Sequence, residues 1–477
     1  MNRDLSFNDL PGEILQEIFS QCLPHPSSIH ALPRFGCQES FASLRNAPLL
    51  LCNVCKQWRA VAISSPNLWT TMSVIVRSGV AVPAPDLVSV WLYRSGALPL
   101  NLALYQQNES TANCVVTGHI LSLFQRHISQ WGDIHFELHG YDHSQSFAMN
   151  EQVGLLLHRF RLHTSLLYPE QEKALFSVLH RAPKLNTLHV SRIPDLDLFG
   201  GSPIPIPWPQ LVHLCLDYVP AVGTALHILN MSPCLETCCM KIDAAKGSLL
   251  YHSSGLSRLR TLSVNLASES LACFFEQLTL PKLVDLTIFV RGPLEHYGWA
   301  QEQFDAFLIR SNCHIRRLEI HDTGMNSSEF AACVQHVGLQ ALAELIIDDT
   351  RGWTWDPFVT QEALRLLTFP LLLGQPYAYE IFTSHQSSRS SVLSGGSIPH
   401  KSYLLPFLKE LTIRGNCLLS PDGAVADMVE SRWKYNIGKA ARLNLVEVEL
   451  PLNHVEDMRR LKGLQGEGLE VVLSQQY

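Results

Sequence analysis

Leu280-Pro-Lys-Leu-Val-Asp-Leu-Thr-Ile288 is the stretch that decides the fold of this chain, because its apolar spacing recurs along the sequence. After a turn led by proline, apolar residues stand at Leu283, Leu286 and Ile288. Other copies of this spacing are Leu185/Leu188/Val190, Leu211/Leu214/Leu216, Leu235/Cys238/Met240, Leu259/Leu262/Val264, Ile315/Leu318/Ile320, Leu342/Leu345/Ile347 and Leu408/Leu411/Ile413. The last two apolar residues of each copy are two apart, which predicts a strand with one buried face.

The copies follow one another at nearly constant intervals. Those that begin at Leu211, Leu235, Leu259 and Leu283 are separated by three intervals of 24 residues. Internal periods in the twenties are typical of leucine-rich repeats, in which each unit buries its apolar face only against its neighbours. The asparagine of regular leucine-rich repeats is mostly missing, so we expect irregular coils. The alternative is a sandwich or an α/β domain with coincidentally spaced leucines.

Two segments near the N-terminus carry apolar residues at helical spacing, Leu10-Pro-Gly-Glu-Ile-Leu-Gln-Glu-Ile-Phe19 and Val54-Cys-Lys-Gln-Trp-Arg-Ala-Val-Ala62. Pro11 suits the first turn of a helix, where its missing N–H has no partner to lose. The second segment is followed by Ser65-Pro-Asn-Leu-Trp69, whose proline ends the helix. The patterns predict two short amphipathic helices.

The order and the residue types of these three segments resemble the F-box of fungal, basidiomycete-type proteins. The resemblance implies docking onto the Skp-type adaptor of a cullin–RING ubiquitin ligase through an exposed apolar rim. The positions that match the family's motif, and that the resemblance makes adaptor-binding, are Leu10, Pro11, Ile14, Leu15, Ile18, Val54, Cys55 and Trp58. The first two pieces stand farther apart than in the shortest F-boxes, with residues 21–48 between them.

We therefore expect a fold of the α/β class, with a small all-helical F-box head over residues 6–72 followed by an irregular leucine-rich-repeat solenoid over residues 98–477. A Ser- and Gly-rich stretch at 374–403 predicts a flexible insert. It is either a disordered loop with phosphorylatable serines or a retained intron or gene-model error. Beyond it, a helix capped by Ser420 and a strand over 441–451 are expected to close the array.

Composition narrows the classes of function. The 477 residues are 46% hydrophobic and 17% charged, and the net charge of −7 argues against a nucleic-acid partner. The 13 cysteines are scattered, as expected of buried thiols in a reducing compartment. We find neither an apolar leader nor a run of membrane-spanning length. These features predict a cytoplasmic or nuclear protein without a membrane partner.

Motifs of catalysis and of metal binding are missing from the sequence. It contains no phosphate-binding glycine loop, no Gly-x-Ser-x-Gly and no HExxH. Cys52 and Cys55 have no second pair at zinc spacing. His135 and His139 would lie about 13 Å apart along a strand, too far for one metal ion. We expect no catalytic residue, no metal and no cofactor.

Exposed positions of the repeat strands are the candidates for recognising a protein substrate of unknown identity: His213, Asp217, Lys241, Asn265, Arg317, Glu319, His321, Asp348 and Arg414. The resulting hypothesis is a substrate-recognition subunit of a Skp/cullin/F-box ubiquitin ligase that carries out no bond chemistry itself. One alternative is a non-catalytic repeat scaffold for protein–protein interaction outside a ubiquitin ligase. A second alternative is an enzyme built on the repeat region.

Overall fold

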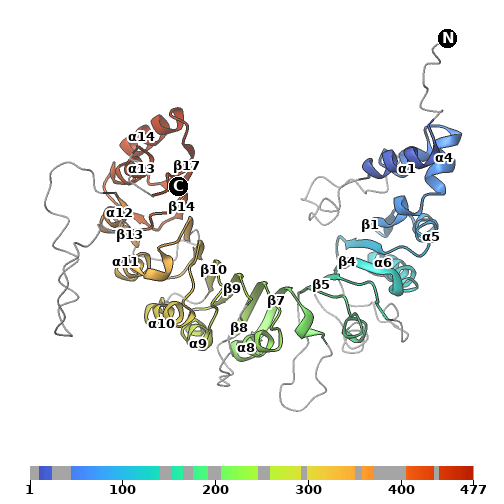
Figure 1. The fold of residues 1–477 in the computed structure, drawn as a ribbon, viewed down its shortest axis with the longest axis horizontal. Helices are drawn as coiled ribbons and strands as arrows, with labels where there is room; N and C mark the ends of the chain where they lie inside the picture. Colours follow the sequence, from blue (N-terminus) through green and yellow to red (C-terminus); the bar gives the residue numbers. More distant parts are fainter. Residues whose placement is uncertain are drawn as a thin grey trace, which may run out of the picture. The chain divides into compact units, whose positions relative to one another are not determined.

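The computed structural model describes residues 10–23, 45–139, 153–164, 176–191, 206–244, 258–291, 298–349, 357–369, 404–434 and 440–475. The fold is α/β, with a mostly parallel sheet of 15 strands and a second sheet of two strands (Figure 1). The chain divides into two compact units. Unit 1 comprises Met1–Pro220 and Met231–Leu235, and unit 2 comprises Ala221–Asn230 and Glu236–Tyr477.

Unit 1 starts with short helices and continues into strands. Its helices are α1 (Gly12–Gln21), α3 (Leu49–Cys52), α4 (Lys56–Ile63), η2 (Pro66–Trp69), α5 (Pro85–Arg94), α6 (Thr111–Gln125), η3 (Ile128–Gln130) and η4 (Trp208–Gln210). Its strands are β1 (Thr71–Arg77), β2 (Val80–Val82), β3 (Leu100–Gln106), β4 (Trp131–Leu138), β5 (Arg159–Thr164), β6 (Thr187–Val190) and β7 (His213–Ala221). Their order in the sheet is β2-β1-β3-β4-β5-β6-β7, and only the β1–β2 pair is antiparallel.

Unit 2 contains strands and helices, and each strand of its main sheet pairs in parallel with the next strand of that same sheet. Its helices are α8 (Val222–Met231), α9 (Ser268–Gln277), α10 (Gln301–Ser311), α11 (Ser327–Gln335), η6 (Val337–Leu339), α12 (Gln361–Leu367), α13 (Ala424–Lys434) and α14 (Val455–Gly466). Its strands are β8 (Thr237–Ala244), β9 (Thr261–Ala267), β10 (Asp285–Arg291), β11 (Arg317–His321), β12 (Glu344–Asp349), β14 (Glu410–Gly415), β16 (Leu445–Leu450) and β17 (Glu470–Gln475). The short strands β13 (Val359–Thr360) and β15 (Leu418–Leu419) form the second sheet.

The strands expected at the recurring apolar spacing are confirmed. Leu286 of β10 stands opposite Leu318 of β11, which stands opposite Leu345 of β12, and all three side chains are buried. Their neighbours in sequence point to the opposite face, as strand geometry requires. In Figure 1 helices α9, α10 and α11 lie along one side of the strands of unit 2, and their phenylalanines are buried there, among them Phe274 and Phe304.

The expected architecture of a small all-helical head followed by an irregular leucine-rich-repeat solenoid was wrong. The finding that overturns it is the 15-stranded, mostly parallel sheet, whose strand β1 starts directly after η2. Helices α1, α3 and α4 belong to the same compact unit as strands β1 to β6. The apolar spacing located the strands, but it carried no information on whether the N-terminal helices would share a core with them. The insert expected at 374–403 lies outside the described residues.

Trp69 joins the N-terminal helices to the α/β part of unit 1. Its side chain is fully buried, and its indole N–H donates a hydrogen bond of 2.8 Å to the carbonyl oxygen of Ala62 in α4. Its ring meets the edge of Trp91 in α5 at 5.0 Å between centroids, and the guanidinium of Arg94 lies 4.5 Å from the ring centroid. One side chain therefore packs against both parts.

We expect Trp69→Ala to lower the free energy of unfolding by about 3–5 kcal/mol, because a buried indole and its hydrogen bond are lost. Urea denaturation of the full chain measures this loss. Tyr93→Ala on α5 is the matched control, since the Tyr93 side chain is 85% exposed and its removal should change stability by less than about 0.5 kcal/mol. Equal effects of the two substitutions would contradict the packing role of Trp69.

Candidate functional site

The N-terminal helices present part of the predicted adaptor-binding set to solvent. Ile14 of α1 and Val54, which lies between α3 and α4, are 49% and 53% exposed, and Pro11 is also exposed. Leu10 and Ile18 are half-buried. These five side chains are available for contact with a partner to different extents.

The other three predicted positions have structural roles. Leu15 is fully buried, so it anchors α1 rather than facing a partner. Trp58 is half-buried and packs against Phe19 at 4.9 Å between ring centroids. Cys55 is the N-cap of α4, and its sulfur accepts a hydrogen bond of 3.4 Å from the backbone N–H of Trp58. The helix predicted from the Val54–Ala62 segment therefore begins after this cap, at Lys56.

Two exposed apolar side chains near these positions were not in the predicted set. Leu50 of α3 is 44% exposed and Ile63 of α4 is 39% exposed. Leu50 has the same helical spacing as the motif residues, so the sequence signal was present. Ile63 directly follows the motif and is exposed because α4 ends there.

The face of the unit 2 sheet opposite the buried leucines carries a network of ion pairs across strands. It includes five of the nine residues predicted to bind a target, namely Arg317, Glu319, His321, Asp348 and Arg414. On β11, Arg317 lies 2.6 Å from a carboxylate oxygen of Glu319, and Nε2 of His321 lies 2.7 Å from the other oxygen. The second nitrogen of His321 lies 3.7 Å from Asp348 on β12. Register brings these groups together, because His321 stands opposite Asp348.

The network continues in both directions along the sheet. Arg414 on β14 stands opposite Asp348 at 3.7 Å and forms two hydrogen bonds of 2.7 and 2.9 Å to the carboxylate of Glu447 on β16. On the other side, the imidazole of His321 stacks on the ring of Phe289 in β10 at 3.9 Å between centroids. The side chains are therefore held in place by partners on both neighbouring strands.

Electrostatics in this network favours the charged form of Glu319. Burial alone raises the pKa of the carboxyl, but the hydrogen bond from His321 and the hydrogen bond and positive charge of Arg317 outweigh it and hold the pKa below its ordinary value of 4.5. The hydrogen bonds of Glu447 likewise raise the pKa of Arg414. Both guanidinium groups are paired with carboxylates, and Arg317 also donates a hydrogen bond of 3.3 Å to the hydroxyl of Thr287.

Carboxylates outnumber guanidinium groups on this face of the described strands β10, β11, β12, β14, β16 and β17. The acidic residues are Asp285, Glu319, Glu344, Asp348, Glu410, Glu447, Glu449 and Glu470. The arginines are Arg291, Arg317 and Arg414. We call this surface the acidic sheet face. An excess of carboxylates favours the approach of a positively charged partner.

A second polar cluster lies on the corresponding face in unit 1. Asp217 of β7 contacts two histidines, Nε2 of His189 on the neighbouring strand β6 at 3.1 Å and Nδ1 of His163 on β5, one strand farther, at 3.5 Å. Burial alone raises the pKa of Asp217, but these two imidazoles lower it well below the usual range. In return, the hydrogen bond of Asp217 raises the pKa of His163.

Sequence reasoning found Asp217 but missed its two histidine partners. His189 occupies the variable position between two buried residues of a repeat strand, so the same outward-facing rule could have found it. Among the remaining predicted target residues, His213 is exposed at the start of β7, and Lys241 of β8 stands opposite Asn265 of β9. The contacts given above for the two clusters are made by other side chains.

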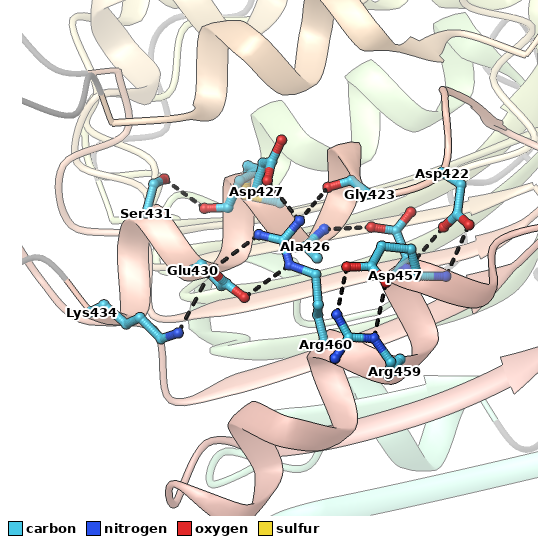
Figure 2. Close-up of polar contacts among 12 residues, drawn as sticks. Asp422, Gly423, Ala426, Asp427, Glu430, Ser431, Lys434, Asp457, Arg459 and Arg460 are labelled. Atoms are coloured by element: carbon cyan, nitrogen blue, oxygen red, sulfur yellow. Dashed lines mark hydrogen bonds and ion pairs between the residues drawn. The ribbon is translucent and has the colours of Figure 1, made fainter. Parts of the chain in front are cut away.

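Helices α13 and α14 exchange caps (Figure 2). Both carboxylate oxygens of Asp422 accept backbone N–H groups at the start of α14, at 2.8 and 2.9 Å. In return, Asp457 of α14 accepts the backbone N–H of Ala426 in α13 at 2.7 Å and contacts Nδ1 of His454 at 2.8 Å. Ser420, the predicted cap, is not at the start of α13, which begins at Ala424. A cap supplied by another helix has no signal in the local sequence.

Figure 2 also shows the ion pairs at the surface of this contact. Arg460 of α14 lies 3.0 Å from Glu430 and 2.8 Å from Asp427, both on α13. The hydrogen bond of Arg460 lowers the pKa of Glu430. The buried capping carboxylate and these partly buried ion pairs thus connect the same pair of helices.

One shallow depression in the described part of the chain is lined by Ser327, Thr360, Gln361, Glu362, Leu419, Ser420 and Pro421. Glu362 is its one titratable side chain, and we assign no chemistry to it.

In the described part of the chain, no helix is both long enough and apolar enough to cross a membrane.

We expect Glu319→Gln to lower the free energy of unfolding at pH 7 by about 1–2 kcal/mol, because hydrogen bonds to a charged acceptor are weakened. The folded-state pKa of Glu319 is depressed, so its stabilisation is present above pH 4.5 and is lost as the pH falls through the folded-state pKa. Urea denaturation of both proteins from pH 7 downwards should therefore give converging stabilities. The exposed Glu470→Gln serves as control, and a pH-independent difference for Glu319→Gln would contradict the network.

We expect Asp457→Ala to lower the free energy of unfolding by about 3 kcal/mol, because the buried N–H of Ala426 loses its acceptor and His454 loses its partner. Asp427→Ala removes a carboxylate that is 66% exposed from the same helix contact and should change stability by less than about 1 kcal/mol. Thermal and urea denaturation compare the two. A similar small loss for both would show that the exchanged caps do not stabilise the contact.

Comparison with known proteins adds no family to this description. No protein-family model matches the chain, and no curated protein matches its sequence.

Proposed function

We propose that this protein is the substrate-recognition subunit of a Skp/cullin/F-box ubiquitin ligase. The observation that carries the proposal is the F-box-like motif, in which Ile14 on α1 and Val54 between α3 and α4 are both exposed. The protein would act in the cytoplasm or nucleus and perform no bond chemistry itself. It would hold a substrate lysine near the ubiquitin-charged enzyme of the ligase, which raises their effective concentration.

The adaptor would dock on the apolar side chains of α1, α3 and α4. Large apolar side chains exposed together in one short segment indicate a surface for a partner. Ile14 is flanked by the buried Leu15, and Val54 directly precedes the Cys55 cap, so the backbone at both positions is held before a partner binds. Leu50 and Ile63 extend the available apolar area.

The protein substrate would bind the acidic sheet face of unit 2. Because carboxylates exceed guanidinium groups there, the fitting segment is rich in lysine and arginine. A basic segment also supplies the lysine that ubiquitin transfer requires. The same charge excess disfavours a nucleic acid on this face, since phosphates would be repelled.

We expect the double substitution Ile14→Asp and Val54→Asp to weaken binding of a Skp-type adaptor at least about 100-fold, because two apolar contacts are replaced by desolvated charges. The measurement is titration of the full-length chain with the purified adaptor, followed by co-purification with the cullin. The matched control is Tyr93→Asp, which adds a charge at a side chain that is 85% exposed.

Three results would overturn the proposal. The first is an intact, folded chain that does not bind the adaptor. The second is adaptor binding that survives the double substitution. The third is adaptor binding without recruitment of the cullin, which would show instead a scaffold outside a ubiquitin ligase.

A further inference from the structure

We propose that His189, Cys215 and Asp217 form a binding site for a divalent transition-metal ion, with Zn²⁺ as the favoured occupant. The inference concerns unit 1 alone and is independent of the ligase function. The ligand atoms are Nε2 of His189, Sγ of Cys215 and a carboxylate oxygen of Asp217. All three lie within 4.8 Å of one another.

Sheet register builds this cluster from two strands. His189 on β6 stands directly opposite Cys215 on β7, and Asp217 lies two residues farther along β7 on the same face. Buried leucines on the other face, Leu188 and Leu214, fix that register. Side chains on one face at directly opposite and adjacent positions are close enough to share a ligand. The site therefore stands on rigid strands rather than on a loop.

The distances suit a single small ion. Nε2 of His189 lies 3.1 Å from Oδ1 of Asp217, and Sγ of Cys215 lies 4.0 Å from the same oxygen. Zinc binds nitrogen and oxygen at about 2.0–2.2 Å and sulfur at about 2.3 Å in tetrahedral geometry, which separates ligand atoms by roughly 3.3–3.8 Å. Small side-chain rotations bring the three atoms to these separations.

The donor types select the metal. A thiolate and an imidazole favour zinc and other borderline or soft ions, whereas magnesium and calcium require oxygen ligands. Three protein ligands leave the fourth tetrahedral position for a water molecule or a partner's side chain. The half-exposed positions of His189 and Asp217 give an ion access from solvent.

A second layer of contacts orients the carboxylate. Nδ1 of His163 lies 3.5 Å from Oδ2 of Asp217. This oxygen remains available to His163 when Oδ1 binds the ion. The same imidazole nitrogen lies 3.1 Å from the hydroxyl of Ser191. Metal-binding carboxylates are commonly held in this way by a neighbouring donor. His163 is thus a positioning residue and not a ligand.

A second group of metal-binding residue types in the described part of the chain, Asp422, His454 and Asp457, is already used in helix capping. The carboxylates of Asp422 and Asp457 accept backbone N–H groups at the starts of α14 and α13. An ion there would have to replace these capping bonds. In the unit 1 cluster, Asp217 contacts the side chains of His163, His189 and Cys215. An ion there would not have to replace a capping bond to the backbone.

Binding exchanges protons for the ion. The thiol of Cys215 would lose its proton to solvent, and the neutral imidazole of His189 would bind the ion through the lone pair of Nε2. Metal affinity should therefore fall as the pH falls, since protons compete for the same atoms.

The test uses the full-length chain after removal of metals with EDTA. Titration with Zn²⁺ against a chromophoric chelator measures stoichiometry and affinity, and titration with Co²⁺ reports a thiolate ligand through its charge-transfer absorption. We expect one equivalent of metal and a cobalt–thiolate band. Cys215→Ser should abolish the band, and His189→Ala or Asp217→Asn should weaken Zn²⁺ binding at least about tenfold.

The controls are Cys22→Ser and His180→Ala, which change an exposed thiol and an exposed imidazole outside the cluster and should leave the titration unchanged. A second measurement uses the unsubstituted chain, in which Zn²⁺ should protect Cys215 from alkylation, as read by peptide mass mapping. A chain that binds no Zn²⁺, binding that survives all three cluster substitutions, or alkylation of Cys215 unaffected by Zn²⁺ would overturn the proposal.

Discussion

The rest of the structure depends on the in-register burial of aliphatic side chains along one face of the parallel sheet. Leu286, Leu318, Leu345 and Leu411 stand opposite one another on four neighbouring strands and are at most 2% exposed. A shift of one residue in any strand would move its leucines to the other face, so burial holds the register firmly. The same register decides which polar side chains meet on the opposite face.

That opposite face differs in chemistry between the two units. In unit 2 it carries carboxylates in excess, with Arg317 and Arg414 bridging neighbouring strands. In unit 1 it brings imidazoles, a thiol and a carboxylate together around Asp217. The backbone arrangement is alike in both cases, and the outward residues of each strand account for the difference. The proposed docking surface and the proposed metal site would therefore stand on the same type of framework.

The N-terminal helices combine packing with exposure inside a very short segment. Leu15 and Phe19 are fully buried, whereas Ile14, the residue before Leu15, is half exposed. Trp69 then shares its packing between α4 and α5, which is why the helices are part of unit 1 and not a separate head. Because these helices belong to unit 1, their exposed apolar side chains stand on backbone that is folded before a partner binds.

The sequence by itself determined the strands, their buried leucines and the outward direction of residues such as Arg317 and Asp217, because alternation along a strand is a local property. It also determined the motif that the proposed function rests on. Only the tertiary structure decided that Asp457 caps α13 and that His163 and His189 meet Asp217. Each of these contacts joins groups whose partners are set by packing and strand register, and neither is encoded in the few residues around them.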